Sequence, residues 1–351
     1  MSKFLAQKLN TLKPYVPGEQ PKDAQYIKLN TNENPYSPSK YSVDAIDREQ
    51  IEKLKLYSDP ESFNLRTAIA NYYNVNLQNI IVGNGSDEIL AFIFAAYGEC
   101  GVVFPDITYG FYRVFANLYG VKYDAIPLTD DYKIDVNDYE KANKTVIIAN
   151  PNAQTGDYLT LIQIEELLKN NRENVVVIDE AYIDFGGESA VKLIDKYENL
   201  IVVQTFSKSR SLAGARVGFA VASSALIADL NAVKNSFNPY NVNRLSALLA
   251  EKAIKDKEYF IQNCNKIIAT RKRLVENLKS LGFFVIPSKA NFIMTKTEKI
   301  SGERLYLQLK ERGVLVRYFS DERIKNFVRI TIGTDEQTNI LIAKIKEIIG
   351  E

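Results

Sequence analysis

The sequence has 351 residues, no histidine and only two cysteines, Cys100 and Cys264. Without histidine there is no imidazole for acid–base catalysis, for a histidine-based catalytic triad or for metal binding. The two cysteines are far apart and show no metal or redox spacing, so we expect no metal site. An enzyme of this composition must use Lys, Tyr, Asp or Glu as its proton carrier, or depend on a cofactor.

Long apolar runs and an excess of one charge are also absent. The longest apolar stretch, Ile89–Tyr97, is too short to cross a bilayer, which takes about 20 residues. Lys and Arg number 44 against 43 Asp and Glu, which argues against nucleic-acid and membrane-surface partners. The first residues contain no apolar core and no small-residue cleavage site, so we expect no signal peptide and a reducing, cytoplasmic location.

The remaining composition is that of a globular α/β protein. Hydrophobic residues make up 46% and charged residues 25% of the chain, enough for a sizeable core. Continuous apolar runs alternate with helical patterns, which predicts a mainly parallel sheet, buried on both faces and flanked by helices. The predicted strands are residues 79–83, 101–105, 144–151, 174–179 and 200–206.

Residues 251–350 predict a smaller α+β unit. A helix over 251–282 ending at Gly282 precedes strands and helices between 283 and 350. The chain then divides into an N-terminal arm (1–32) packing with the small domain, a large domain (33–240) and a small C-terminal domain (241–351). Two helix starts have capping signals: Ser86, for a helix ending at Gly98, and Thr160, with Gln163 in capping-box spacing.

Lys208 stands between two serines in TFSKSRSLAGARVG, at the end of an apolar run. Burial at a strand end disfavours the charged ammonium. Lys208 could simply reach water along the surface, or it could form a Schiff base with a carbonyl group. Arg216 and the hydroxyls of Thr205 and Ser207 favour the second interpretation, because such groups bind the phosphate of an aldehyde-bearing cofactor.

Other polar residues also follow predicted strands. Asp179 ends the run VVVID and either caps the next turn or pairs with a pyridinium nitrogen, which Tyr182 would accompany at the ring oxygen. The turn VGNGSDE is suited to phosphate but is common in such folds. Tyr109 is either a core aromatic or a ring that stacks on a flat cofactor. The cluster NPNAQTG marks a turn whose asparagine could donate to the ring oxygen.

Taken in order, GNGSDE, ITYGFY, NPNAQTG, DEAY, SKSRSLAGARVG and VRITIG resemble the class I/II aminotransferases of the fold-type I pyridoxal-phosphate enzymes. The resemblance spans roughly residues 15 to 350. LNTNENPY, YSDPES, NLYG and VLVRYF are most similar to the histidinol-phosphate aminotransferase branch. The resemblance implies a large domain with a mainly parallel sheet and a smaller α+β domain.

The resemblance also implies a role for each matching residue. Lys208 would hold pyridoxal phosphate as an internal aldimine and then move the proton between Cα and C4′. Asp179 would pair with the pyridine nitrogen, Tyr182 would bind the ring oxygen, and Tyr109 would stack on the ring. The phosphate would be held by Gly85, Ser86, Asp87, Thr205, Ser207 and Arg216, and by Tyr57 from the partner subunit of a homodimer.

For the substrate, the resemblance implies that Arg329 binds the α-carboxylate or the substrate phosphate, with Arg317 helping and Asn30 nearby. Without the resemblance, both arginines could be ordinary strand-surface charges. The sequence departs from the family at Ala153, where the ring-oxygen asparagine normally stands, and at Gln154, which replaces a proline. We expect Asn152 to act as the substitute.

The expected reaction is transamination between histidinol phosphate and 2-oxoglutarate, giving imidazole-acetol phosphate and glutamate, in histidine biosynthesis. An aromatic amino-acid aminotransferase and a decarboxylase of a phosphorylated amino acid share every cofactor residue and stay open. A non-catalytic relative would lack Lys208 or Asp179, and both are present. A dinucleotide-binding dehydrogenase lacks its G-x-G-x-x-G motif here.

Overall fold

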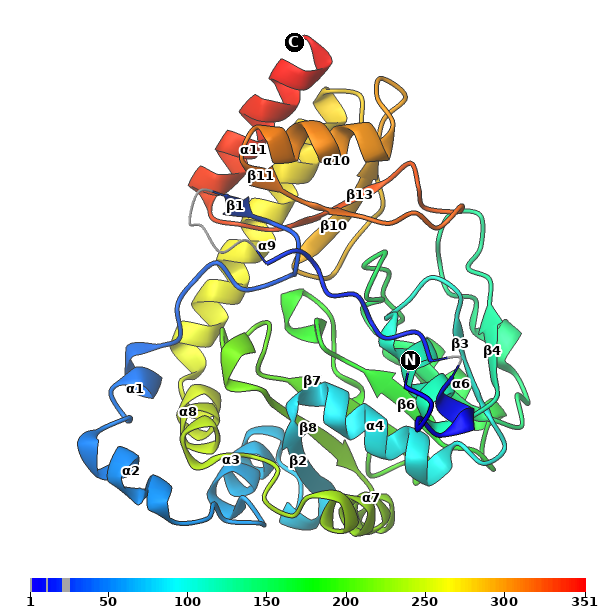
Figure 1. The fold of residues 1–351 in the computed structure, drawn as a ribbon, viewed down its shortest axis with the longest axis vertical. Helices are drawn as coiled ribbons and strands as arrows, with labels where there is room; N and C mark the ends of the chain where they lie inside the picture. The colour runs from blue at the N-terminus through cyan, green and yellow to red at the C-terminus, as the bar shows by residue number, and fades with distance from the viewer. Residues whose placement is uncertain (1, 11, 21–25) are drawn as a thin grey trace.

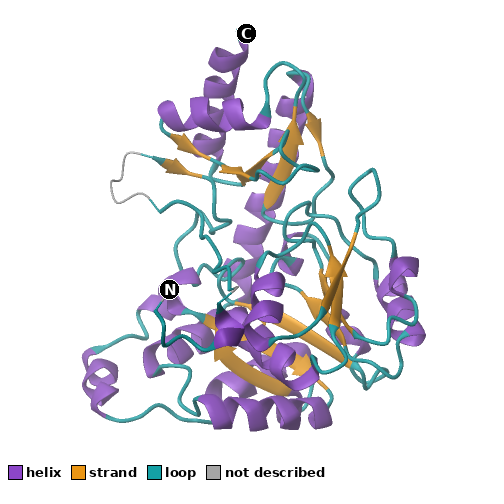
Figure 2. Cartoon of the chain, turned by 45° about the vertical axis from the view of Figure 1, so that its right-hand side comes forward, coloured by secondary structure: helices purple, strands orange, loops and turns teal. Residues whose placement is uncertain are grey.

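The computed structural model describes residues 2–10, 12–20 and 26–351 and contains two main β-sheets, one in each half of the molecule (Figure 1). The larger sheet has seven strands and is surrounded by helices (Figure 2). The long helix α9 (Lys257–Ser280) runs from the lower half into the upper half. Within the described residues, no helix combines the length and apolar character needed to cross a membrane.

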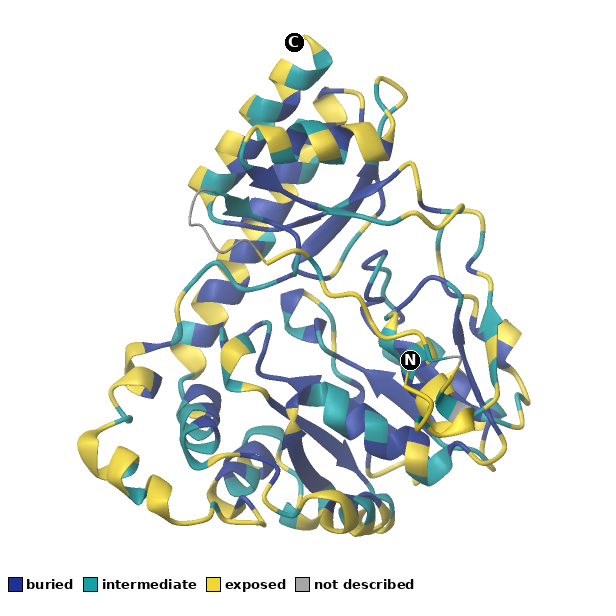
Figure 3. Ribbon diagram, viewed as in Figure 1, coloured by how far each residue is buried: buried dark blue, intermediate teal, exposed yellow. Residues whose placement is uncertain are grey.

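The seven-stranded sheet has the order β2-β8-β7-β6-β5-β3-β4. The strands β4, β3, β5, β6 and β7 run parallel, and β8 is antiparallel to both of its neighbours. Every residue of β5 to β8 is buried, as Figure 3 shows, which confirms the strands predicted from continuous apolar runs. The bounds are β2 Ile80–Asn84, β3 Val102–Pro105, β4 Tyr123–Ile126, β5 Thr145–Ala149, β6 Val176–Asp179, β7 Leu200–Thr205 and β8 Val217–Ala222.

Helices α3 to α8 follow from amphipathic segments whose buried residues pack on one of the two faces of this sheet, whereas the short helices α1 and α2 bury no apolar residue. The predicted capping box of Thr160 and Gln163 is confirmed at the start of α6. The helices are α1 Lys40–Val43, α2 Arg48–Glu52, α3 Phe63–Tyr73, α4 Gly85–Tyr97, α5 Phe111–Tyr119, α6 Leu161–Asn170, α7 Ser224–Phe237 and α8 Arg244–Lys255.

The predicted cap at Ser86 is wrong. Helix α4 begins one residue earlier, at Gly85, with Asn84 as a cap residue that makes no side-chain hydrogen bond to the helix. Gly85 has a φ of 78°, a left-handed conformation that glycine adopts without strain, so the chain turns into the helix before Ser86. The first N–H groups of α4 are therefore left without a side-chain cap.

The upper half contains a four-stranded antiparallel sheet, β12-β13-β10-β9, and a separate pair in which β11 runs parallel to β1 (Ile27–Lys28). Helices α9, α10 and α11 accompany these strands, and residues from all of them join one apolar core. The bounds are β9 Phe284–Val285, β10 Phe292–Lys296, β11 Val314–Leu315, β12 Arg317–Tyr318, β13 Val328–Thr331, α10 Gly302–Glu311 and α11 Asp335–Ile349.

The single helix predicted over 251–282 is wrong, because the chain breaks at Asp256. Helix α8 ends at Lys255, and Asp256 caps α9 by accepting a hydrogen bond from the backbone N–H of Tyr259. Aspartate side chains compete with backbone hydrogen bonding in this way and favour helix starts over helix interiors. Gly282 follows the last turn, as predicted, with a φ of 81°.

The division into arm, large domain and small domain stays a prediction. Strand β1, within the arm, pairs with β11, while Tyr15 stacks on Phe111 of α5 with ring centroids 4.4 Å apart. The arm therefore contacts both halves of the molecule. Helix α8, within the range predicted for the small domain, packs against α1 and α3.

Candidate active site

A cavity of about 520 Å³ lies where three neighbouring parallel strands end. The last residues of β5, β6 and β7, which are Ala149, Asp179 and Thr205, all line it. Ligands of open α/β sheets bind at this edge of the sheet. The structure brings nine of the predicted residues together in the lining: Ser86, Asp87, Tyr109, Asp179, Tyr182, Thr205, Ser207, Lys208 and Arg216.

Lys208 projects from the loop after β7 and is half-buried. Its Nζ donates to the backbone oxygen of Thr31 (3.4 Å) and lies 5.8 Å from the centre of the Tyr182 ring. The Nδ2 of Asn34 donates to the backbone oxygens of Lys208 (3.0 Å) and Ser209 (3.2 Å), which fixes the lysine loop. The lysine is thus held at the cavity by residues from the N-terminal segment, which composition and motif spacing do not predict.

One end of the cavity is built to bind an anion. The uncapped N-terminus of α4 reaches it at Ser86, where backbone N–H groups and the helix dipole favour negative charge. Arg216 donates to Ser207 Oγ (3.4 Å), which lies 2.9 Å from Thr205 Oγ1. A Cβ on Gly218 would lie 2.2 Å from the backbone nitrogen of Ser86, so only glycine lets β8 approach the helix end this closely.

The side chain of Asp87 orders two other residues of this end. Its Oδ2 pairs with Arg216 Nη2 (3.0 Å), and its Oδ1 accepts from the Tyr109 hydroxyl (2.7 Å). Burial, reinforced by the Asp87 carboxylate, raises the pKa of Tyr109 well above its ordinary value, so the ring stays neutral. Tyr109 therefore presents a fixed, uncharged aromatic ring to the cavity, as a stacking role requires.

Asp179 lies at the base of the cavity and is almost fully buried. Burial raises its pKa to about 6, although donors offset part of this effect. The Tyr112 hydroxyl donates to Oδ2 (2.7 Å), and the N–H of Ala181 donates to Oδ1 (3.2 Å). A cationic ring nitrogen placed against Asp179 would supply the charge that this buried carboxylate lacks. Tyr112 was not predicted, although its spacing of three residues from Tyr109 places both rings at the start of α5.

Replacing Asp179 by asparagine should stabilise the protein when it is prepared without a cofactor near neutral pH. The pKa of Asp179 is about 6 in the folded chain against an ordinary value of 3.8, so the unfolded chain releases this proton at lower pH. Folding stability therefore falls as the pH rises from about 4 through about 6, by about 3 kcal/mol in all. Asparagine removes this penalty but loses one of two hydrogen bonds, which costs about 1 kcal/mol.

We therefore expect Asp179→Asn to raise the free energy of unfolding by about 2 kcal/mol at about pH 7.5. This gain should disappear below about pH 4. Urea unfolding of both cofactor-free proteins at the two pH values measures it. A variant that is less stable than the wild type at the higher pH would contradict the effect of burial on Asp179.

The position of Asn152 does not favour its predicted contact with a ring oxygen. Its Nδ2 donates to the backbone oxygen of Ile107 (3.0 Å), and its Oδ1 accepts from the N–H of Gln154 (3.0 Å). Ala153 lines the cavity, and Asn152 does not. Both polar ends of Asn152 hold the turn after β5 in this structure, so its contact with a ring oxygen stays a prediction.

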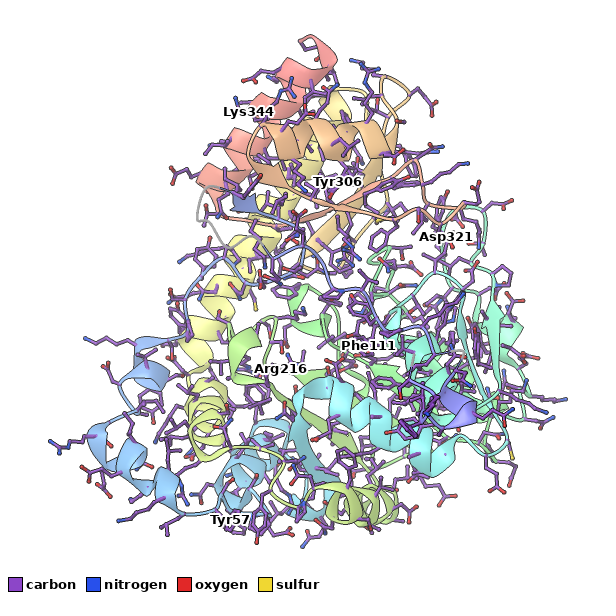
Figure 4. All side chains as sticks on the ribbon, viewed as in Figure 1. Tyr57, Phe111, Arg216, Tyr306, Asp321 and Lys344 are labelled. Carbon is purple, nitrogen blue, oxygen red and sulfur yellow. The ribbon has the colours of Figure 1, made fainter. Side chains whose placement is uncertain are left out.

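Tyr57 lies outside the cavity of its own chain. Its side chain is 81% exposed and stacks on Tyr240, with ring centroids 4.7 Å apart. Figure 4 shows Tyr57 at the lower edge of the molecule, well away from Arg216 in the centre. Gly85 also does not line the cavity, but a Cβ there would lie 2.5 Å from Arg216 Nη2, so its contribution is to let the arginine approach α4.

A second cleft of about 1080 Å³ opens beside the first and shares Tyr109, Ala153, Tyr182 and Lys208 with it. The predicted substrate residues Asn30, Arg317 and Arg329 all line this cleft. Lys208 therefore lies where the first cavity meets the second cleft, which contains the two arginines.

Arg317 and Arg329 stand directly opposite each other on β12 and β13, so their side chains share one face of the sheet. Like charges in this position repel unless an anion joins them, and neither arginine pairs with a carboxylate within the described part of the chain. Both guanidinium groups lie 5.3 Å from the centre of the Phe319 ring. The arrangement is chemically suited to an anion and has an aromatic wall.

Backbone oxygens hold the two arginines in place. Arg329 donates to the backbone oxygen of Ala153 (3.0 Å) and to Gln154 Oε1 (3.3 Å), and burial lowers its pKa. Arg317 donates to the backbone oxygen of Val16 (3.3 Å), in the arm. Asn30 donates through Nδ2 to the backbone oxygen of Glu19 (2.8 Å), so it connects the arm to the cleft.

This fold and site define a known class of enzyme, and the chain belongs to the aminotransferase class I and II family, whose model matches residues 24–345. Its fold is that of the fold-type I pyridoxal-phosphate-dependent transferases. The histidinol-phosphate aminotransferase of Brachyspira hyodysenteriae is 53% identical over 99% of both chains, and that of Clostridium acetobutylicum is 53% identical over 100% of both.

Among solved structures, a histidinol-phosphate aminotransferase from Clostridium acetobutylicum superimposes with a TM-score of 0.86 at 27% identity, covering 92% of this chain and 99% of that one. Both comparisons agree with the resemblance carried by the motifs. The two relatives compared by sequence cover 99% and 100% of this chain, and the solved structure covers 92% of it.

Proposed function

We propose that the protein is a pyridoxal-phosphate-dependent aminotransferase that transfers the amino group of histidinol phosphate to 2-oxoglutarate, in histidine biosynthesis. One observation supports this substrate pair most strongly: Arg317 and Arg329 lie side by side on neighbouring strands and line a cleft that also contains Lys208. Histidinol phosphate carries a phosphate and 2-oxoglutarate carries two carboxylates, so both substrates need a cationic site beside the lysine.

The residues of the cavity fit pyridoxal phosphate. Thr205, Ser207, Arg216 and the N-terminus of α4 would hold its phosphate, and Asp179 would hold its ring nitrogen in the protonated form. When bound, the cofactor supplies the electron sink that stabilises negative charge at the substrate Cα. The ring would lie against Tyr109, because its hydroxyl is fixed by Asp87.

Lys208 performs two tasks in this account. It would hold the cofactor covalently, and its free amine would move a proton between Cα of the substrate and C4′ of the cofactor. Tyr182 would donate its hydroxyl proton to the ring oxygen. Arg329 binds a carboxylate or phosphate through its two parallel N–H groups, with Arg317 beside it, and so orients the Cα–H bond toward Lys208.

We also propose a homodimer in which Tyr57 reaches the cofactor phosphate of the partner subunit. The support is that Tyr57 is exposed, lies away from the cavity of its own chain, and stands among exposed apolar residues such as Leu54, Leu56 and Phe63. We place the enzyme in the cytoplasm, since Cys100 and Cys264 are both free thiols.

The amino donors can be compared directly in the purified protein loaded with pyridoxal phosphate. With 2-oxoglutarate as acceptor, we expect kcat/KM for histidinol phosphate to exceed that for tyrosine and phenylalanine by at least about 100-fold, because a phosphate carries more charge and more acceptor oxygens than a single carboxylate for the paired Arg317 and Arg329. Glutamate formation is measured alongside carbon dioxide release from O-phosphothreonine. A preference for tyrosine would assign the chain to aromatic transamination, and carbon dioxide release would assign it to decarboxylation.

A further inference from the structure

Asn32 makes a buried contact with Tyr182 that joins the N-terminal segment to the cavity. Its Nδ2 lies 3.1 Å from the Tyr182 hydroxyl oxygen, 150 positions away in the sequence. Asn32 is 2% exposed and has a φ of 57°, a left-handed conformation that asparagine tolerates better than most residues. Its backbone oxygen accepts from Asn291 Nδ2 (3.0 Å), which fixes the segment beside β10.

The hydrogen bonds of Thr331 determine which way the Asn32 amide faces. Thr331 Oγ1 accepts from the backbone N–H of Asn32 (2.9 Å) and lies 3.1 Å from Asn32 Oδ1. The threonine donates its one proton to Oδ1 in this orientation, whereas a turned amide would take that acceptor away from the hydroxyl proton. The amide NH₂ must then face Tyr182, where it can only donate.

We infer that Asn32 is a positioning residue that directs the hydroxyl proton of Tyr182 into the cofactor cavity. Because the amide donates to the tyrosine oxygen, the tyrosine proton is free to be donated to a second acceptor. Tyr182 lines the cavity, so the ring oxygen of the cofactor is the acceptor within reach. The inference rests on the proposed function, and it assigns to Asn32 a role that motif spacing does not suggest.

The surroundings of Tyr182 leave few competing acceptors. The ring packs edge-on against Phe292, with centroids 5.1 Å apart. The titratable groups that act on it are Lys208, whose Nζ lies 5.8 Å from the ring centre, and Arg329, Tyr109 and Tyr112. Lysine and arginine only donate, so among these groups they cannot take the tyrosine proton.

The substitution Asn32→Asp reverses this hydrogen bond. Aspartate keeps the size of the side chain and tolerates the left-handed backbone, but its carboxylate accepts from Tyr182 instead of donating to it. The cofactor ring oxygen then loses a donor that stabilises its deprotonated form. We expect the pH midpoint of the visible absorption change of the bound cofactor to rise by about one unit.

The same substitution should lower kcat by about tenfold or more while leaving the KM for glutamate close to the wild-type value, because Arg329 is untouched. Thr331→Val is a second variant that introduces no charge. Valine makes no hydrogen bond to the Asn32 amide, so this amide is free to turn. The pH midpoint of the cofactor absorption should therefore rise, but by less than in Asn32→Asp.

Thr295→Val is the matched control. Thr295 is buried in the neighbouring strand β10, and its hydroxyl donates to the backbone oxygen of Phe284, away from the cavity. This control should keep the wild-type midpoint. A wild-type midpoint in Thr331→Val and in folded Asn32→Asp would overturn the inference, as would an equal rise in all three variants.

The affinity of each cofactor-free variant for pyridoxal phosphate gives a readout that is independent of turnover. Loss of the ring-oxygen donor should weaken binding in Asn32→Asp and Thr331→Val but not in Thr295→Val. If the wild-type protein itself does not bind pyridoxal phosphate, the proposed function fails; if it binds and turns over while the variants match it, only the inference fails.

Discussion

Replacing Lys208 by alanine should abolish transamination, with turnover falling by at least about 10⁴-fold, because the variant loses both the covalent attachment of the cofactor and the proton carrier. The cavity itself should persist, since Asp179, Arg216 and the start of α4 do not depend on the lysine side chain. The variant should therefore still bind pyridoxal phosphate, but without a reducible covalent bond. Steady-state assays and mass spectrometry after borohydride reduction measure the two effects.

Lys192→Ala is the control, because Lys192 is exposed and pairs only with Glu188 on the surface. It should keep wild-type turnover and the covalent bond. Substantial turnover in Lys208→Ala, or a cofactor attached to another lysine, would contradict the assignment of Lys208.

The Lys208→Ala variant also tests whether Tyr57 completes the active site of the partner subunit. If Tyr57 serves the partner subunit, mixing Lys208→Ala with Tyr57→Ala chains creates dimers with one intact site, containing Lys208 from one chain and Tyr57 from the other. Random exchange of subunits makes about half of the dimers mixed, and each mixed dimer has one intact site out of two. The mixture should therefore regain about a quarter of the wild-type activity. Mixtures no more active than the separate variants, despite confirmed subunit exchange, would contradict this placement of Tyr57.

Replacing Arg329 by alanine should weaken the binding of glutamate by about 2–5 kcal/mol, since a buried carboxylate loses its paired cation. This corresponds to a rise of roughly 30-fold or more in the KM for glutamate. Arg329→Lys keeps the charge but not the two parallel N–H groups, so it should fall between alanine and wild type. Steady-state kinetics with glutamate and with histidinol phosphate measure both effects.

Arg312→Ala is the matched control, because Arg312 lies at the end of α10, outside the cleft, and donates to the backbone of its own helix. It should leave both KM values unchanged. An unchanged KM for glutamate in Arg329→Ala would remove this arginine from the substrate site.

The fold and much of the site follow from local features of the sequence. Continuous apolar runs predict the strands of the large sheet, and polar residues directly after them, such as Asp179 and Lys208, predict a site at the strand ends. The strands are confirmed, and Asp179 and Lys208 line one cavity, because parallel strands place their carboxyl ends at a common edge.

The contacts that the sequence does not predict are those between distant segments. Asn32 meets Tyr182, and Asn34 meets the loop of Lys208, through hydrogen bonds that have no periodic pattern. The break at Asp256 has another cause: the surrounding residues are good helix formers, and the capping bond from Tyr259 to the Asp256 side chain is what starts a new helix there. The hydrogen bonds that Asn152 makes within its own turn are likewise not readable from the spacing of the motif.

The most direct test of the account is the visible spectrum of the purified, cofactor-loaded protein before and after histidinol phosphate is added without any 2-oxo acid. We expect the absorption of the covalently bound cofactor to disappear as the amino group is transferred, and to return when 2-oxoglutarate is added. A spectrum that ignores histidinol phosphate but responds to tyrosine or phenylalanine would contradict the proposed substrate, and a protein that binds no pyridoxal phosphate would contradict the account as a whole.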